Sequence, residues 1–141
     1  MSDSIQDPAS PQPQPPAYAA PAASSSGLPD NVAAALAYVT IIPAIIFLVL
    51  QPFNKIPLVR FHSFQSIAFC VAAIVVQVAM TVVEGFLYVI PMSWALFPAV
   101  HMLVGLALFI AWLILILMAS QGEWYKLPVI GDFAEKQARS L

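Results

Sequence analysis

Hydrophobic residues fill three long stretches of the chain from which Asp, Glu, Lys and Arg are absent. The hydrocarbon layer of a bilayer is about 30 Å thick, and roughly 20 apolar residues cross it as a helix. Helices suit this environment because they satisfy their own backbone hydrogen bonds in lipid. The pattern therefore predicts an all-α membrane protein with three transmembrane helices, at about residues 31–50, 60–84 and 99–120.

Prolines interrupt the apolar pattern around the first of these helices. Asp30 precedes an alanine-rich start and is expected to act as the N-cap of the helix. Pro43 lies inside the helix and predicts a kink near residues 39–40, because proline removes a backbone hydrogen bond. Pro52 and Pro57 then separate the first helix from the second.

The region between the second and third expected helices is open to several interpretations. The apolar run continues to Ile90, which makes it longer than the hydrocarbon layer. Pro91 and Pro98 bracket a turn, with Trp94 between them as an interfacial anchor. Residues 85–98 are therefore interfacial, re-entrant or part of a long second helix. A separate fourth crossing is disfavoured by the two prolines.

Residues 1–27 form a low-complexity segment of Pro, Gln, Ala and Ser. Such a composition buries too little apolar area to offset the entropy of ordering, so we expect a disordered tail before a membrane domain at residues 28–141. The tail contains no Lys or Arg and no apolar core, so it lacks the parts of a signal peptide. The first apolar span is expected to target the chain to the membrane.

The basic residues predict a topology. Lys55 and Arg60 lie between the first two expected helices, and Lys126, Lys136 and Arg139 follow the third. Two crossings separate these groups, so with three spans they share one side, which the positive-inside rule makes cytoplasmic. The expected arrangement is N-out and C-in.

Composition narrows the classes of function. Of the 141 residues, 61% are hydrophobic and only 9% are charged, against about 25% charged residues in soluble domains. The net charge of −2 provides no basic surface for nucleic acid, and a lone cysteine, Cys70, excludes an internal disulfide. No catalytic motif is present, and the sequence indicates no metal site and no cofactor.

The second expected helix carries a polar stripe on one face. The residues are spaced by three or four positions, so they share a helical face that should point toward the other helices. The stripe includes Ser66, Gln77, Thr81 and Glu84. Either it fixes helix packing by hydrogen bonding or it lines a hydrated path, and packing is the favoured interpretation. Glu84 and His101 are expected at the same outer level, where they form a candidate pair.

Two segments resemble a known family. Residues 59–66 read VRFHSFQS, and residues 121–135 read QGEWYKLPVIGDFAE. They resemble small uncharacterised bacterial membrane proteins with an RFHxxQ segment that opens one span and a QGxxxKLPxIGDxAE segment that closes another. This family is also similar to the twenty-kilodalton subunit of the chloroplast inner-envelope import translocon. The resemblance implies a multi-pass protein of the bacterial plasma membrane and leaves its activity open.

Both segments fall on the side predicted to be cytoplasmic, where they are expected to form a latch. In this latch Arg60 would meet Glu123, Asp132 or Glu135, and Gln65 would contact the loop backbone. Asp132 and Glu135 have the spacing of a capping box for a short interfacial helix at about 132–139. The candidate latch comprises Arg60, His62, Gln65, Glu123, Lys126, Asp132 and Glu135.

Three functions fit these features. The first is a non-enzymatic scaffold or subunit that acts through helix packing and the latch. The second is an oligomeric transporter or channel that uses the polar stripe, since three helices enclose little volume alone. The third is a protein-translocation component. The expected partners are the lipid bilayer and either further copies of the chain or other membrane proteins, with no nucleic acid.

Overall fold

The chain is described here by a computed structural model that places residues 27–140. All regular secondary structure in this range is helical. The elements are α1 (Asp30–Leu36), α2 (Ile41–Val49), the short 3-10 helix η1 (Phe53–Lys55), α3 (Pro57–Leu87), α4 (Ser93–Ser120) and α5 (Ile130–Ser140). The prediction of an all-α protein is confirmed within these residues.

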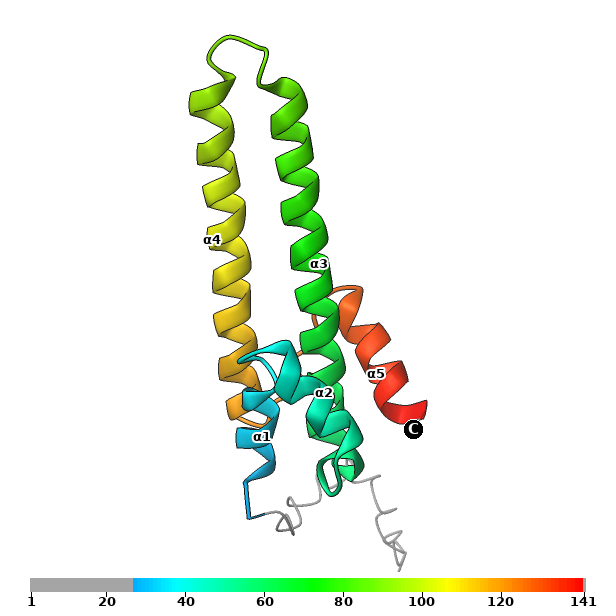
Figure 1. Ribbon diagram of the computed structural model, residues 1–141. Helices are drawn as coiled ribbons and strands as arrows, with labels where there is room; N and C mark the ends of the chain where they lie inside the picture. Colours follow the sequence, from blue (N-terminus) through cyan, green and yellow to red (C-terminus); the bar gives the residue numbers. More distant parts are fainter. Residues whose placement is uncertain (1–26, 141) are drawn as a thin grey trace, which may run out of the picture.

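Two long antiparallel helices, α3 and α4, form the frame of the molecule (Figure 1). With 31 and 28 residues they extend about 46 and 42 Å, so both exceed the hydrocarbon layer. Both are apolar enough to cross a membrane. Much of their apolar surface is uncovered: Val75 and Leu103, for example, are each 61% exposed. In lipid, such surface faces acyl chains.

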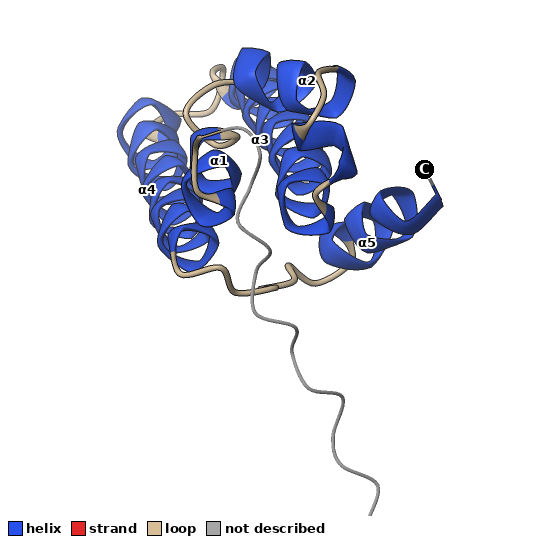
Figure 2. Cartoon of the chain, turned by 90° about the horizontal axis from the view of Figure 1, so that it is seen from below, coloured by secondary structure: helices blue, strands red, loops and turns tan. Residues whose placement is uncertain are grey.

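The smaller helices pack against only one half of this hairpin. Figure 1 shows α1, α2 and α5 beside the part of α3 and α4 that is remote from their connecting turn, and Figure 2 shows them distributed around α3 and α4 when seen along the hairpin. We call this part, which includes Pro57 and Ser120, the packed half. All five Lys and Arg residues of the chain belong to it or to the segments that leave it.

The prediction of a first transmembrane helix at residues 31–50 is wrong. Residues 37–40 separate α1 from α2, and neither helix is long enough to cross a bilayer. Pro43 lies in the first turn of α2, where its missing N–H costs little, but its ring would clash with the carbonyl of Val39 in a continuous helix. Thr40 is accordingly extended, with φ −150° and ψ 169°. The predicted kink is a complete break.

The chain reverses at this break, so α1 and α2 form a re-entrant pair. Asn31 Nδ2 donates a hydrogen bond to the carbonyl of Ser120 over 2.6 Å, which places the start of α1 beside the end of α4. η1 then leads into α3 at the same end of the hairpin (Figure 1). Residues 27–140 contain two candidate membrane spans. The N-out topology required three crossings within this range, so its basis is lost.

The boundaries near the turn also differ from expectation. α3 continues to Leu87 and α4 begins at Ser93, so residues 85–98 mostly extend the two long helices. Met92 adopts a left-handed conformation, with φ 68°, in the tight connection. Pro98 lies inside α4, where it removes one hydrogen bond close to the helix start. At the other end of the chain, α5 starts at Ile130, two residues before the expected position.

Candidate functional site

A buried polar cluster lies where α3 crosses the re-entrant pair and the segment that follows α4. His62, in the second turn of α3, is fully buried at its centre. Its Nε2 lies 3.0 Å from the carbonyl oxygen of Glu123, and its Nδ1 lies 3.2 Å from the hydroxyl of Tyr38. A carbonyl only accepts hydrogen bonds, so we assign the ring proton to Nε2. Nδ1 then accepts from Tyr38, which fits a neutral imidazole.

Gln65 extends this cluster one turn along α3. Its Nε2 donates to the carbonyl of Tyr125 over 3.0 Å, so two alternate carbonyls of the connecting segment are held by α3. Between them, Trp124 stacks on Phe61, with 4.9 Å between the ring centroids. The VRFHSFQS segment thus binds the QGEWYKLPVIGDFAE segment through side-chain contacts to backbone and ring stacking. The expected contact of Gln65 with loop backbone is present.

The non-helical tip of the re-entrant pair is also tied to the long helices. Ser66 Oγ donates to the carbonyl of Ala37 over 2.6 Å, and Trp112 Nε1 donates to the carbonyl of Tyr38 over 2.8 Å. Ser66 is nine residues beyond Pro57, about 14 Å along the helix. Inside the hydrocarbon layer, irregular backbone is tolerated only where its polar groups are hydrogen-bonded within the protein. These two bonds stabilise the break.

Glycine and a charged triplet position α5. A Cβ built on Gly131 would lie 2.6 Å from Cβ and 2.8 Å from Cα of Lys126, so only glycine permits this approach. Glu135 accepts hydrogen bonds from Lys126 over 2.5 Å and from Arg139 over 2.6 Å. Lys126, with the smaller effect of Arg139, holds the pKa of the Glu135 carboxyl below its ordinary value.

The expected role of Arg60 in the latch is not found. Within residues 27–140, Arg60 forms no ion pair with Glu123, Asp132 or Glu135, and its Nη2 is buried without a hydrogen-bond partner. Glu135 pairs with Lys126 and Arg139 instead, and Glu123 contributes its carbonyl rather than its carboxylate.

The expected capping arrangements differ as well. Asp132 is an exposed residue in the first turn of α5 and is not its N-cap, since the helix begins at Ile130. A carboxylate there still opposes the positive end of the helix dipole. α1 likewise begins at Asp30, with Pro29 in the N-cap position and no side-chain cap.

The polar stripe of α3 does not form one continuous contact. Ser66 binds the re-entrant tip, whereas Thr81 donates to the carbonyl of Gln77 in its own helix. Gln77 faces α4, because a Cβ on Gly105 would lie 3.8 Å from its Nε2. Near the turn, His101 Nδ1 lies 2.8 Å from Glu84 Oε1, so the structure brings the candidate outer pair together. No group of three metal-ligating side chains occurs among residues 27–140.

Sequence reasoning missed two participants, Tyr38 and Trp112. Both are aromatic residues with one polar atom, placed within apolar runs near the proline break or inside the third span. Buried Tyr and Trp usually find a partner for that polar atom. The only signal in the sequence was therefore the presence of one polar atom on each of two aromatic residues in apolar runs.

Two long, apolar, antiparallel helices with a hydrogen-bonded packed half define a helical membrane protein. The chain belongs to the UPF0132 membrane protein family. It is 37% identical over 116 residues to a member from Methanocaldococcus jannaschii, with 82% of this chain and 94% of the relative covered. It is 36% identical to a member from Archaeoglobus fulgidus, with 77% and 94% covered. A second protein of Methanocaldococcus jannaschii is 30% identical over 117 residues.

These relatives are archaeal, whereas the sequence resemblance pointed to bacteria, and their names assign no activity. No family model matches the chain. No solved structure matches it either.

Proposed function

We propose that the protein is a non-catalytic membrane scaffold or subunit that presents the outer halves of α3 and α4 to a protein partner in the bilayer. The supporting observation is the division of the hairpin into two unlike parts. In the packed half, polar side chains such as His62, Gln65 and Ser66 are bound to backbone carbonyls of neighbouring segments. Their hydrogen-bonding capacity serves to join elements, which is typical of a structural role.

The half nearer the turn offers mainly apolar side chains for contact. Met102 and Leu103 on α4 and Val78 on α3 are each more than half exposed. Helix association in lipid depends on van der Waals packing and small residues, so uncovered apolar helices are a usual means of assembly there. In the middle of α4, Ala107, with Ala111 four residues later, provides a small-residue approach.

We also propose an orientation. Lys55, Arg60, Lys126, Lys136 and Arg139 all belong to the packed half or its extensions, so the positive-inside rule favours the cytoplasmic side for it. Because α1 starts beside the end of α4, both ends of the described chain would then be cytoplasmic. The plasma membrane is the location we expect.

Site-specific photo-crosslinking in native membranes tests the scaffold function. A photoreactive residue at Leu103, which is 61% exposed, should give a discrete protein adduct identifiable by mass spectrometry. The same residue at Leu115, which is fully buried, should give none and serves as the matched control. Lipid adducts alone at Met102, Leu103 and Val78 would refute the scaffold. An adduct with nascent chains would indicate translocation instead.

One observation favours transport as the second candidate: Gln77 Oε1 is buried between the long helices without a hydrogen-bond partner among residues 27–140. Several copies of the chain would be needed to enclose a path. Flux measured in proteoliposomes and abolished by Gln77→Leu would support the transporter. Equal permeability of proteoliposomes and empty liposomes would count against it.

A further inference from the structure

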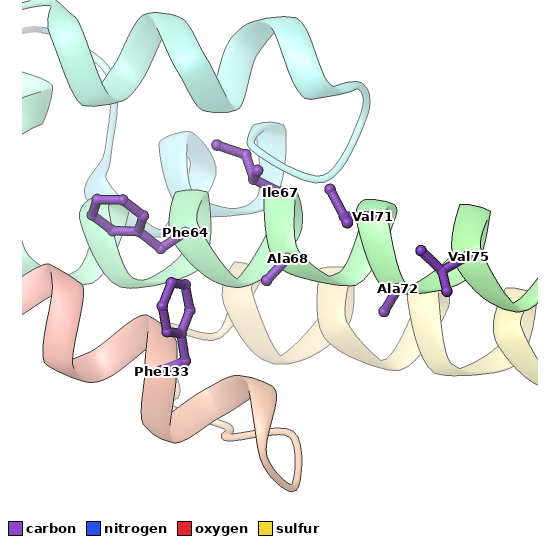
Figure 3. Close-up of a pocket in the computed structure, with 7 residues that line it drawn as sticks. All are labelled: Phe64, Ile67, Ala68, Val71, Ala72, Val75 and Phe133. Carbon is purple, nitrogen blue, oxygen red and sulfur yellow. The ribbon is translucent and has the colours of Figure 1, made fainter.

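An apolar groove of about 430 Å³ runs along α3 (Figure 3). α5 contributes Phe133, which faces Phe64 across it. The remaining lining comes from Ile67, Ala68, Val71, Ala72 and Val75 of α3. Val71 and Val75 are 52% and 61% exposed, so the groove is open along its length. In a bilayer such a groove holds apolar chains.

The groove begins at the edge of the hydrocarbon layer. If Glu84 marks one edge of the hydrocarbon layer, the roughly 20 residues that cross it place the other edge near Phe64. The face of α3 that lines the groove continues toward the turn as Val78 and Val82, which are 57% and 50% exposed. The same face continues in the other direction to Arg60, one helical turn before Phe64. The groove therefore extends from the interface into the membrane.

Arg60 places an uncompensated positive charge at the interfacial end of this face. It has no ion pair among residues 27–140, and its Nη2 is buried without a partner. Glu135, the half-buried carboxylate of α5, is already shared by Lys126 and Arg139. Arg60 as a whole is only partly buried, so rotation of its side chain would bring the guanidinium out to a phosphate, whose oxygens match the guanidinium fork.

We propose that the groove binds one acyl chain of an anionic phospholipid whose phosphate is held by Arg60. The groove and its charge fit this occupant, because Arg60 lies at the level of the headgroups and the apolar lining lies deeper in the membrane. Basic residues at cytoplasmic helix ends commonly recognise anionic headgroups. Lys136 contributes less, because it shares a face of α5 with Asp132, four residues earlier.

Native mass spectrometry of the full chain, released from nanodiscs with equal amounts of phosphatidylglycerol and phosphatidylcholine, tests the headgroup contact. The parent should retain phosphatidylglycerol preferentially. Arg60→Gln should lower this retention at least about tenfold, as expected for a lost charge-assisted hydrogen bond. Arg60→Lys should give an intermediate loss. Lys55→Gln removes a cation of the same half from η1 and should change nothing.

A second pair of variants tests the groove. Ala72→Phe fills its inner part and should lower retention severalfold, whereas Ala107→Phe, at an exposed position on α4 outside the lining, should not. Soluble glycerol phosphate should fail to displace the lipid, which separates a lipid site from a free phosphate site. Circular dichroism confirms that each variant is folded. Equal retention of the two lipids, or unchanged retention in folded Arg60→Gln, would overturn the proposal. Identical effects of Ala72→Phe and Ala107→Phe would show that the groove does not hold the acyl chain.

Discussion

The side-chain amide of Gln65 donates a hydrogen bond to the backbone carbonyl of Tyr125, 60 residues further along the chain. One turn earlier on α3, His62 makes the equivalent contact with the carbonyl of Glu123. Two side chains of one helix thus hold a segment that has no regular structure of its own. This relationship makes the packed half sensitive to changes that would be harmless near the turn.

His62→Ala should destabilise the protein by about 2–4 kcal/mol. It would remove the imidazole from the carbonyl of Glu123 and from the hydroxyl of Tyr38 and would open a cavity at a fully buried position. Unfolding in detergent, followed by circular dichroism, measures this loss. His101→Ala is the control: its side chain is 28% exposed, and its loss should cost about 1 kcal/mol or less. Equal losses of stability in the two variants would show that the buried cluster contributes no more to stability than the pair near the turn.

Gly131→Ala should destabilise the protein by about 1–3 kcal/mol, because the new Cβ would overlap backbone atoms of Lys126. Backbone cannot rotate away as a flexible side chain can. Gly85→Ala is the matched control, since a Cβ there meets nothing within 4 Å and alanine favours the helix by roughly 0.5–1 kcal/mol. Opposite shifts in melting temperature are expected. A neutral Gly131→Ala would place α5 farther from Lys126 than the structure has it.

Acid should weaken the attachment of α5. The pKa of Glu135 is lowered by Lys126 and Arg139, so its contribution to stability is present above the ordinary glutamate pKa of about 4.3 and is lost as the pH falls through the lowered value. The protection of residues 130–140 against hydrogen exchange, expressed relative to the intrinsic exchange rate at each pH, should therefore fall in acid. Glu135→Gln should show this lower protection already at neutral pH, and a further fall in that variant in acid would point to another group.

Cysteine labelling separates the two-span topology from the N-out arrangement. In a Cys70→Ser background, Val89→Cys lies in the turn at a site that is 86% exposed in the parent. Gly27→Cys precedes α1 at the opposite end of the hairpin, and no other described residue lies within 4 Å of a Cβ built there. Impermeant maleimide applied to intact cells should label position 89 and leave position 27 unmodified. Labelling of position 27 with protection of position 89 would reverse the orientation.

Much of the fold was predictable because the apolar pattern is strong. The two spans were expected at 60–84 and 99–120, and the structure has them as Pro57–Leu87 and Ser93–Ser120. Both extend beyond the predicted ends because apolar residues continue through the expected interface, and a proline such as Pro98 is tolerated near a helix start. The short amphipathic helix after the second span was expected at 132–139 and occupies Ile130–Ser140.

The re-entrant pair shows where local pattern was insufficient. Residues 31–50 have the length and apolarity of a transmembrane helix, and Pro43 alone could mean a kink or a break. The outcome depends on whether exposed carbonyls at a break find donors. Ser66 and Trp112, from two other helices, supply those donors. No local pattern contains this information, because the donors are 29 and 74 residues away.

The sequence by itself determined that this is a helical membrane protein with its basic residues at one end, since apolar length and charge placement act residue by residue. Only the tertiary structure decided which charges meet. Arg60 was expected to pair with a carboxylate of the C-terminal segment, yet Lys126 and Arg139 occupy Glu135. The close approach of Gly131 to Lys126 brings that lysine over α5. Ion pairs depend on distances of a few ångströms, which packing sets and sequence spacing does not.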